Sequence, residues 1–139
     1  MHGGTGYPQA RLLALVACGT RTLIDAVFGP VTSGETTYAA GLLGSLRAGM
    51  PMLADRNFAA GWLIAAIAAT KADALVRVKA GRYAPALPFM RRHGDGSCLS
   101  RFGGVPARVV DARITITTRQ AAAPGWSRAR GCCGPVRSR

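Results

Sequence analysis

The sequence predicts an α/β fold built from short strands and two helices. Three patterns predict this class: two aliphatic runs separated by a short turn, a strand–helix–strand order in the middle of the chain, and strand-like runs after it. The 139 residues allow one modest domain and exclude two. Because 49% of the residues are hydrophobic and only 17% are charged, most of the chain is expected to fold.

The first expected element is an antiparallel β-hairpin. Its strands are Ala10–Cys18 and Thr22–Val27, and Gly19 in the turn between them is free to adopt a positive φ angle. Residues 1–9, which precede the hairpin, are rich in glycine. We therefore expect these nine residues to be disordered.

A helix is expected over residues 34–47. Thr32 and Glu35 have the spacing of a capping box, in which both side chains satisfy free amides at the helix start. Leucines at helical spacing continue the pattern, and Gly49 stands where a left-handed C-terminal cap belongs. The segment therefore carries start, stripe and stop signals of one helix.

A strand–helix–strand unit comes next. The strands are expected over Met50–Asp55 and Ala74–Val78, and the helix between them begins at a cap on Asn57 and ends near Thr70. Nearly the whole surface of this helix is apolar, so it must pack against neighbours on more than one side. The two strands are expected to be parallel neighbours joined by a right-handed crossover.

The last third of the chain is expected to hold a second β-hairpin and a disordered tail. Residues Ser97–Phe102 and Ala107–Thr118 are strand-like, and Gly103-Gly104 supplies the turn between them. Residues 119–139 contain five arginines, no acid and few aliphatic side chains. Such a segment cannot bury enough surface to offset the entropy of ordering it.

The charge balance points to polyanionic partners. Lys and Arg number 18 against 6 Asp and Glu, which gives a net charge of +12. A field of that sign attracts nucleic acid or acidic lipid. The longest uncharged apolar stretch, Phe58–Ala69, is shorter than the roughly 20 residues that cross a bilayer. No membrane-spanning helix is therefore expected.

One alternative is an exported lipoprotein. Arg11 is followed by apolar residues that lead to Cys18 and Gly19, which fits a bacterial lipoprotein signal and would anchor the protein through Cys18. Against it, the apolar core is at the short limit for a signal peptide. The residues after Cys18 are also strand-like, whereas a lipoprotein has a flexible tether there.

The cysteines and histidines do not indicate a metal site. The chain has no CxxC or HxxxH spacing, and adjacent Cys132 and Cys133 cannot easily place both sulfurs on one tetrahedral ion. Cys18 and Cys98 stand in apolar runs. Both are therefore expected to be small buried hydrophobes, and no disulfide framework is indicated.

Asp55 is the residue most suited to chemistry. It ends a predicted strand of an α/β sheet, and ligands of such sheets collect outside the carboxyl ends of the strands. A carboxylate there suits Mg²⁺ or Mn²⁺, and two such ions promote attack on a phosphate. One Asp alone cannot do this. In the alternative interpretation, Asp55 caps the following helix or pairs with Arg56.

Three stretches resemble a known family. They are Tyr7–Thr20, Gly34-Glu35 before a leucine-rich helix, and above all Leu53-Ala-Asp-Arg-Asn-Phe58. Together they resemble the central part of DDE-type transposases of the large bacterial insertion sequence family four. The resemblance implies a partial ribonuclease H-like core over residues 10–80 and the start of a β-rich insertion over residues 81–118. It makes Asp55 the second of three acidic ligands for Mg²⁺ or Mn²⁺.

The chain also departs from this family. The first Asp of the family lies upstream of the Tyr7 region, Asp25 is no substitute for it, and no Glu follows Glu35 to serve as the third ligand. Residues 119–139 fit no family pattern and have the composition of GC-rich DNA read out of frame. We therefore expect a truncated, frameshifted and catalytically incomplete transposase fragment in the cytoplasm.

The expected partner is DNA, both transposon ends and target, with no membrane and no small-molecule substrate. Full-length relatives could oligomerise on DNA. The residues expected to contact phosphates are Arg56, Arg77, Lys79, Arg82, Arg91 and Arg92. Two alternatives remain: these residues form only a solvated face, or the chain is a non-catalytic module that binds DNA electrostatically. Phe58 and Trp62 are expected in the core, because both lie on the apolar helix.

Overall fold

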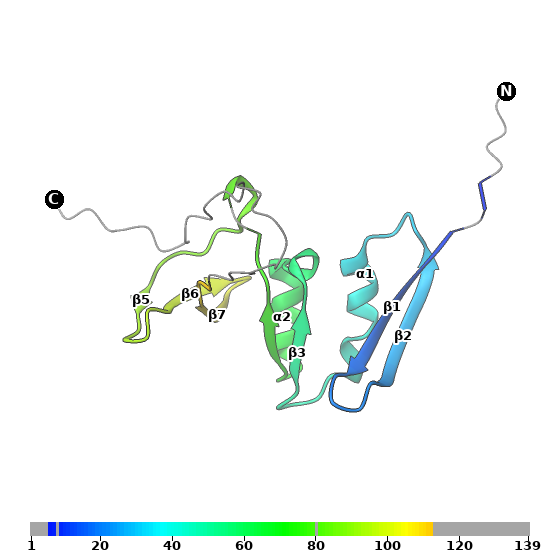
Figure 1. Ribbon diagram of the computed structural model, residues 1–139, viewed down its shortest axis with the longest axis horizontal. Helices are drawn as coiled ribbons and strands as arrows, with labels where there is room; N and C mark the ends of the chain where they lie inside the picture. Colours follow the sequence, from blue (N-terminus) through cyan, green and yellow to red (C-terminus); the bar gives the residue numbers. More distant parts are fainter. Residues whose placement is uncertain (1–5, 8, 80, 113–139) are drawn as a thin grey trace, which may run out of the picture.

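The protein is a mixed α/β structure with three small sheets and two α-helices in its described residues, which confirms the predicted class (Figure 1). The computed structural model describes residues 6–7, 9–79 and 81–112. In chain order, the elements are β1 (Ala10–Ala17), β2 (Thr22–Pro30), α1 (Glu35–Gly41), η1 (Leu43–Ser45), β3 (Pro51–Ala54), η2 (Arg56–Phe58), α2 (Gly61–Ala69), β4 (Asp73–Val76), η3 (Gly81–Tyr83), β5 (Arg91–Arg92), β6 (Cys98–Phe102) and β7 (Val105–Val109).

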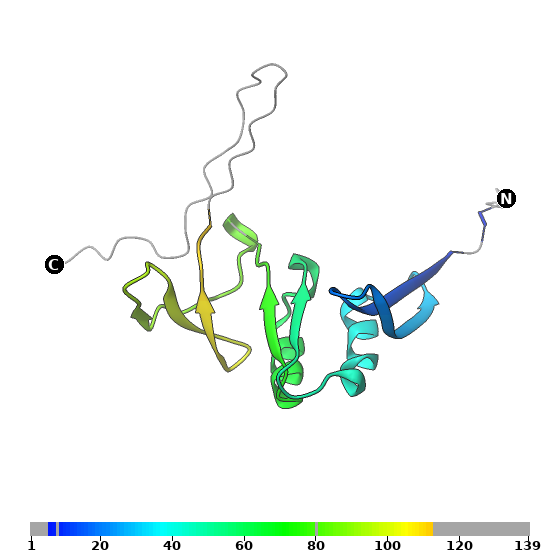
Figure 2. The same ribbon diagram turned by 60° about the horizontal axis from the view of Figure 1, so that its bottom comes forward.

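The sheets follow one another along the longest axis of the molecule. Figures 1 and 2 show the β1–β2 hairpin with α1 at one end, β3 and β4 with α2 in the middle, and the sheet of β5, β6 and β7 at the other end. The strands of one sheet do not pair with those of another within the described residues. Side chains therefore hold the three parts together.

The predicted β-hairpin is confirmed, and its turn differs in detail. Strands β1 and β2 pair antiparallel, and β2 continues to Pro30, beyond the predicted end. The residue with a positive φ in the turn is Arg21, at 57°, and not Gly19. The backbone N–H of Arg21 donates to the Ala17 carbonyl oxygen at 2.7 Å, which closes the turn one residue before β2 begins.

The predicted helix over residues 34–47 is wrong in length and in its cap. Helix α1 ends at Gly41 and is followed by the short 3₁₀ turn η1. Glycine is a poor helix former, and Gly41 lies against the Val27 side chain, where a Cβ would already be in contact. The N-cap is Gly34, with no side-chain capping bond, so the Thr32 capping box does not form.

The start of α1 is instead fixed by the hairpin. The Tyr38 hydroxyl donates to the Pro30 carbonyl oxygen at 2.8 Å, and the Arg11 guanidinium donates to the Ser33 carbonyl oxygen. Gly49 has the predicted positive φ, at 78°, but it does not cap the helix. Its N–H donates to the Lys71 carbonyl oxygen at 3.1 Å, beside the first residues of β3 and β4.

The strand–helix–strand unit is confirmed. Strands β3 and β4 pair in parallel, in a register that runs from Pro51 opposite Asp73 to Ala54 opposite Val76. Helix α2 connects them and contacts α1, β4, β6 and β7, so the predicted packing on more than one side is also confirmed. The predicted cap at Asn57 is wrong, because Asn57 lies in η2 and α2 begins after Ala60.

The core is centred on α2. Leu63 and Ile67 are each only 1% exposed, and Phe58 packs against this cluster as predicted. The prediction that Trp62 lies in the core is wrong, because its side chain is 53% exposed. Trp62 is therefore the one large side chain of α2 that the neighbouring elements leave open to solvent.

The second hairpin is confirmed in part. Strands β6 and β7 pair antiparallel around Gly103 and Gly104, both with positive φ, and β7 ends at Val109. The remainder of the predicted strand, residues 113–118, lies outside the described residues, as do the tail over 119–139 and most of 1–9. The prediction of a buried cysteine is confirmed for Cys98 and wrong for Cys18, which is exposed in the β1–β2 turn.

A close backbone contact joins α2 to the second hairpin. Gly103 has a φ of 59°, and a Cβ at this residue would lie 1.9 Å from the carbonyl oxygen of Gly61. Real Cβ atoms do not approach oxygen so closely, so only glycine fits here. Gly104 has a φ of 81°, and a Cβ added to it would meet nothing within 4 Å, so it differs from Gly103 only in the absence of this contact.

We expect Gly103→Ala to lower the free energy of unfolding by about 2 kcal/mol or more, because it combines left-handed strain with a backbone clash. Gly104→Ala is the matched control, since it introduces the strain without the clash. Urea denaturation of both variants measures the difference. Equal destabilisation of the two would show that the contact between the hairpin and α2 does not form.

The turn before β6 holds a polar network around Asp95. The carboxylate accepts hydrogen bonds from the Ser97 hydroxyl at 2.6 Å and the Ser97 N–H at 3.1 Å, and the Arg108 guanidinium pairs with it from β7. The bonds from Ser97, followed by the charge of Arg108, lower the pKa of Asp95 from 3.8 to about 2.

Because the folded state lowers this pKa, the network stabilises the fold above the ordinary pKa of 3.8 and loses its effect as the pH falls through about 2. Carboxyl-carbon NMR should give a titration midpoint near 2 for Asp95. Arg108→Gln should raise the midpoint only partly, since both bonds from Ser97 remain. A midpoint at the ordinary value in the folded protein would refute the network.

Candidate functional site

Asp55 occupies the position that the sequence predicts, directly after β3 at the carboxyl end of a parallel strand. Its backbone is extended, with φ −78° and ψ 170°, and its carbonyl oxygen accepts the N–H of Phe58 at 3.0 Å to begin η2. The sharp change from strand to 3₁₀ turn directs the chain away from the sheet. The Asp55 side chain is left 60% exposed.

The partner of Asp55 is Arg77, and neither of the two predicted alternatives forms. Because Ala54 is opposite Val76 in the parallel register, the next residues, Asp55 and Arg77, are also neighbours. Arg77 Nε lies 3.9 Å from Asp55 Oδ1, and the Arg77 N–H donates to the Ala54 carbonyl oxygen at 3.3 Å. The Asp55 side chain caps no helix, and its ion pair is with Arg77 and not with Arg56.

This ion pair is exposed and weak. The Arg77 and Asp55 side chains are 70% and 60% exposed, so water screens the attraction, and exposed pairs contribute little to stability. A pair of this kind leaves both groups able to exchange partners. A phosphate that approached this edge would compete with Asp55 for the Arg77 guanidinium.

The residues around Asp55 do not fit a divalent metal site by themselves. The part of the chain that the structure describes has no group of three or more His, Cys, Asp or Glu side chains that could hold a metal ion. The Asp25 carboxylate accepts the Ser45 hydroxyl and the Ala26 N–H, and Asp73 starts β4 at the opposite end of the sheet. The ion-pair partner of Asp55 is a guanidinium, which repels cations.

The six predicted phosphate contacts are all exposed, but they do not form one surface. Arg56 and Arg77 flank Asp55 at the carboxyl ends of β3 and β4, and Lys79 follows shortly after β4. Arg82 lies in η3, where its guanidinium is 4.7 Å from the centre of the Tyr83 ring. Arg91 and Arg92 form β5, in a different sheet, away from the Asp55 edge (Figure 1).

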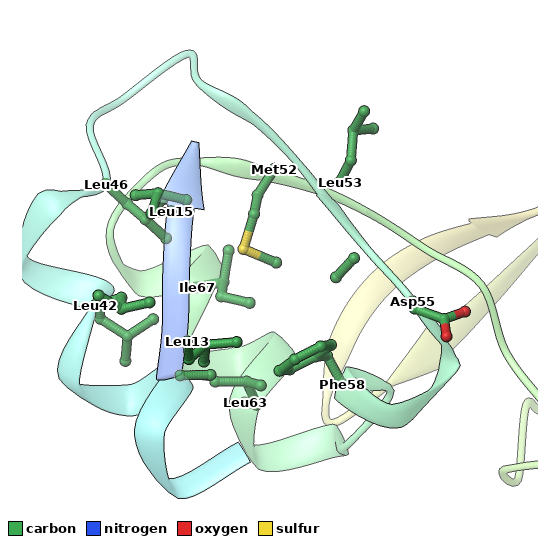
Figure 3. A pocket seen from close by; sticks show the side chains of 13 residues that line it. Leu13, Leu15, Leu42, Leu46, Met52, Leu53, Asp55, Phe58, Leu63 and Ile67 are labelled. Carbon is green, nitrogen blue, oxygen red and sulfur yellow. The ribbon is translucent and has the colours of Figure 1, made fainter. Parts of the chain in front are cut away.

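An apolar groove beside Asp55 is a feature that sequence reasoning missed. It has a volume of about 160 Å³, and side chains from β1, α1, β3 and α2 line it (Figure 3). Asp55 is its single charged lining residue and lies at one end of the labelled side chains. The alternation of Leu13 and Leu15 with exposed neighbours in β1 indicated a buried face, but not that this face borders a groove.

Comparisons of the chain with protein-family models, with curated proteins and with solved structures found no match. Among the described residues, no helix combines the length and the apolar character needed to cross a membrane. The geometry around Asp55 and the sequence patterns therefore carry the functional argument.

Proposed function

We propose that this chain is the central part of a DDE-type DNA transposase with a ribonuclease H-like core, and that it binds DNA without cutting it alone. One observation carries the proposal: an exposed carboxylate, Asp55, directly follows a parallel strand of a strand–helix–strand unit. The order of hairpin, helix, strand, helix and strand is the order that the resemblance implies. Its site of action is the bacterial cytoplasm, where the DNA is.

The lack of cleavage follows from the donor set. A carboxylate that belongs to a three-ligand site needs two further acids close by, and the described residues bring none to Asp55. The ion pair that Asp55 makes instead is with Arg77. In this chain, Asp55 is therefore a retained ligand position and not a working metal site.

The DNA-facing surface of this proposal is the edge where β3 and β4 end. Arg56, Arg77 and Lys79 are exposed there, and the net charge of +12 raises the local concentration of any polyanion. Phosphate contacts of this kind carry no sequence information. The binding is expected to be strong at low salt and to weaken steeply as salt rises.

A second candidate function is a purely electrostatic DNA-binding module. The pairing of Asp55 with Arg77 favours it, because a guanidinium beside the carboxylate supports phosphate binding and opposes cation binding. The lipoprotein alternative is less compatible with the hairpin. Processing at Cys18 would remove β1, which pairs with β2 along its whole length.

The flanking DNA distinguishes the two candidates. If the chain is a transposase fragment, the DNA around its gene, read in all frames, should encode a strand with an Asp upstream of Tyr7. It should also encode a helix with a Glu downstream. Flanking DNA that lacks both segments would leave only the electrostatic module.

DNA binding by the Asp55 edge is tested with a labelled duplex titrated at several salt concentrations. Arg77→Gln should reduce the slope of log affinity against log salt by about 0.9, the value of one phosphate contact. Asp55→Asn should increase affinity, because it removes a negative charge and releases Arg77. The matched control is Arg101→Gln, which removes one exposed arginine from β6, in the other sheet.

Two outcomes would count against these expectations. Equal slopes for the Arg77 and Arg101 variants would show that DNA does not use this edge. Nicking of plasmid DNA with Mg²⁺ that is lost in Asp55→Asn would show that the chain is catalytically complete.

A further inference from the structure

We propose that the apolar groove between β1 and β3 is an acceptor site for one extended β-strand of a second polypeptide. This inference concerns the groove and does not depend on the DNA-related function. It is carried by two unpaired strand edges that border one apolar cavity.

The two edges belong to different sheets. Within the described residues, β1 pairs only with β2, and β3 pairs only with β4, so each strand has one edge without a partner strand. Both strands contribute side chains to the same groove, Leu13 and Leu15 from β1 and Met52 and Leu53 from β3. In Figure 1 the two strands run in opposite directions, one on each side of this region.

The floor of the groove is apolar and already buried. Leu42 and Leu46, which follow α1 and η1, and Leu63 and Ile67 of α2 line it, and each is buried. Figure 3 shows these side chains on the helical side of β1 and β3. Any occupant therefore needs aliphatic side chains on the face that it turns towards the helices.

Only an extended strand satisfies both the walls and the floor. A strand between β1 and β3 offers N–H and C=O groups to both edges and places alternate side chains on the floor. It would be antiparallel to one neighbour and parallel to the other. A helix or a small apolar molecule would cover the floor but leave the backbone groups of both edges without partners.

The occupant must come from outside the described fold. Every described strand already pairs along at least one edge, and the occupant needs both edges free. Residues 1–9, which lead into β1, include Pro8 and three glycines, and they contain no Val, Leu or Ile. This segment cannot supply alternating aliphatic side chains.

The charges around the groove define the occupant further. Exposed arginines stand at both ends: Arg47 follows Leu46 at one end, and Arg56 follows Asp55 at the other. The net charge of the chain has the same sign, at +12. The partner segment is therefore a strand with aliphatic side chains at alternate positions and acidic residues at its two ends.

The probe is an end-capped peptide that alternates valine and threonine between two terminal glutamates. We expect saturable binding to the full chain, a higher Tm, and slower amide hydrogen exchange in β1 and β3 but not in β5. The same peptide with proline at its central valine lacks a backbone donor and should bind at least about tenfold more weakly. A version with lysines in place of the glutamates should also bind more weakly.

Two substitutions in β1 locate the site. Leu13→Asp places a charge in the groove and should lower the peptide affinity by about tenfold or more. Leu12→Asp is the matched control, because Leu12 is on the other face of the same strand and is 67% exposed. The proline peptide keeps the test valid if the Leu13 variant does not fold, since it uses the unchanged protein.

Three outcomes would overturn the proposal. The first is no binding, or equal binding of the valine and proline peptides. The second is protection of β1 and β3 that grows with protein concentration without peptide, which would make a second copy of this chain the occupant. The third is full protection of both edges at every concentration without peptide, which would make another segment of the same chain the occupant.

Discussion

The burial of α2 is the constraint on which the rest of the structure depends. This helix is apolar around almost its whole circumference, so no single neighbour can cover it. It contacts α1 on one side, β4 on another, and β6 and β7 on a third. Each of the three sheets is too small to be stable alone, and contact with this helix or with α1 links them to one another.

This constraint also sets the place of the candidate site. The side chains of Leu63 and Ile67 fix α2 beneath β3, and the parallel register of β3 with β4 then places Asp55 beside Arg77. The backbone contact between Gly61 and Gly103 fixes the start of the same helix against the second hairpin. Asp55 and its neighbours therefore lie on a rigid part of the chain, although their side chains are exposed.

The sequence predicts the elements whose pattern is local, and it fails where a distant contact decides. Alternation in β1 and the apolar run of α2 are enough to predict the first hairpin and the parallel pair. The length of α1 is not predictable, because the Val27 side chain and two glycines, not the leucine spacing, end it. Trp62 is misplaced for the same reason, since its exposure depends on which elements surround α2.

The candidate site is predictable to the same extent. The position of Asp55 follows from the general behaviour of parallel sheets, but its pairing with Arg77 requires the register of two strands that are separated by a helix. That register has one sequence signal: both residues immediately follow their strands. The groove has none, because its walls are residues far apart in the chain, Leu13 and Met52, that no sequence pattern connects.

The groove and the carboxylate are physically linked, because Asp55 lines one end of the groove. A strand that filled the groove would displace water from one side of Asp55, and a lower local dielectric strengthens the attraction between a carboxylate and a guanidinium. Arg77 would then be held more firmly by Asp55 and would be less available to a phosphate. Occupation of the groove and binding of a polyanion at the Asp55 edge should therefore oppose each other, and by linkage each would weaken the other to the same degree.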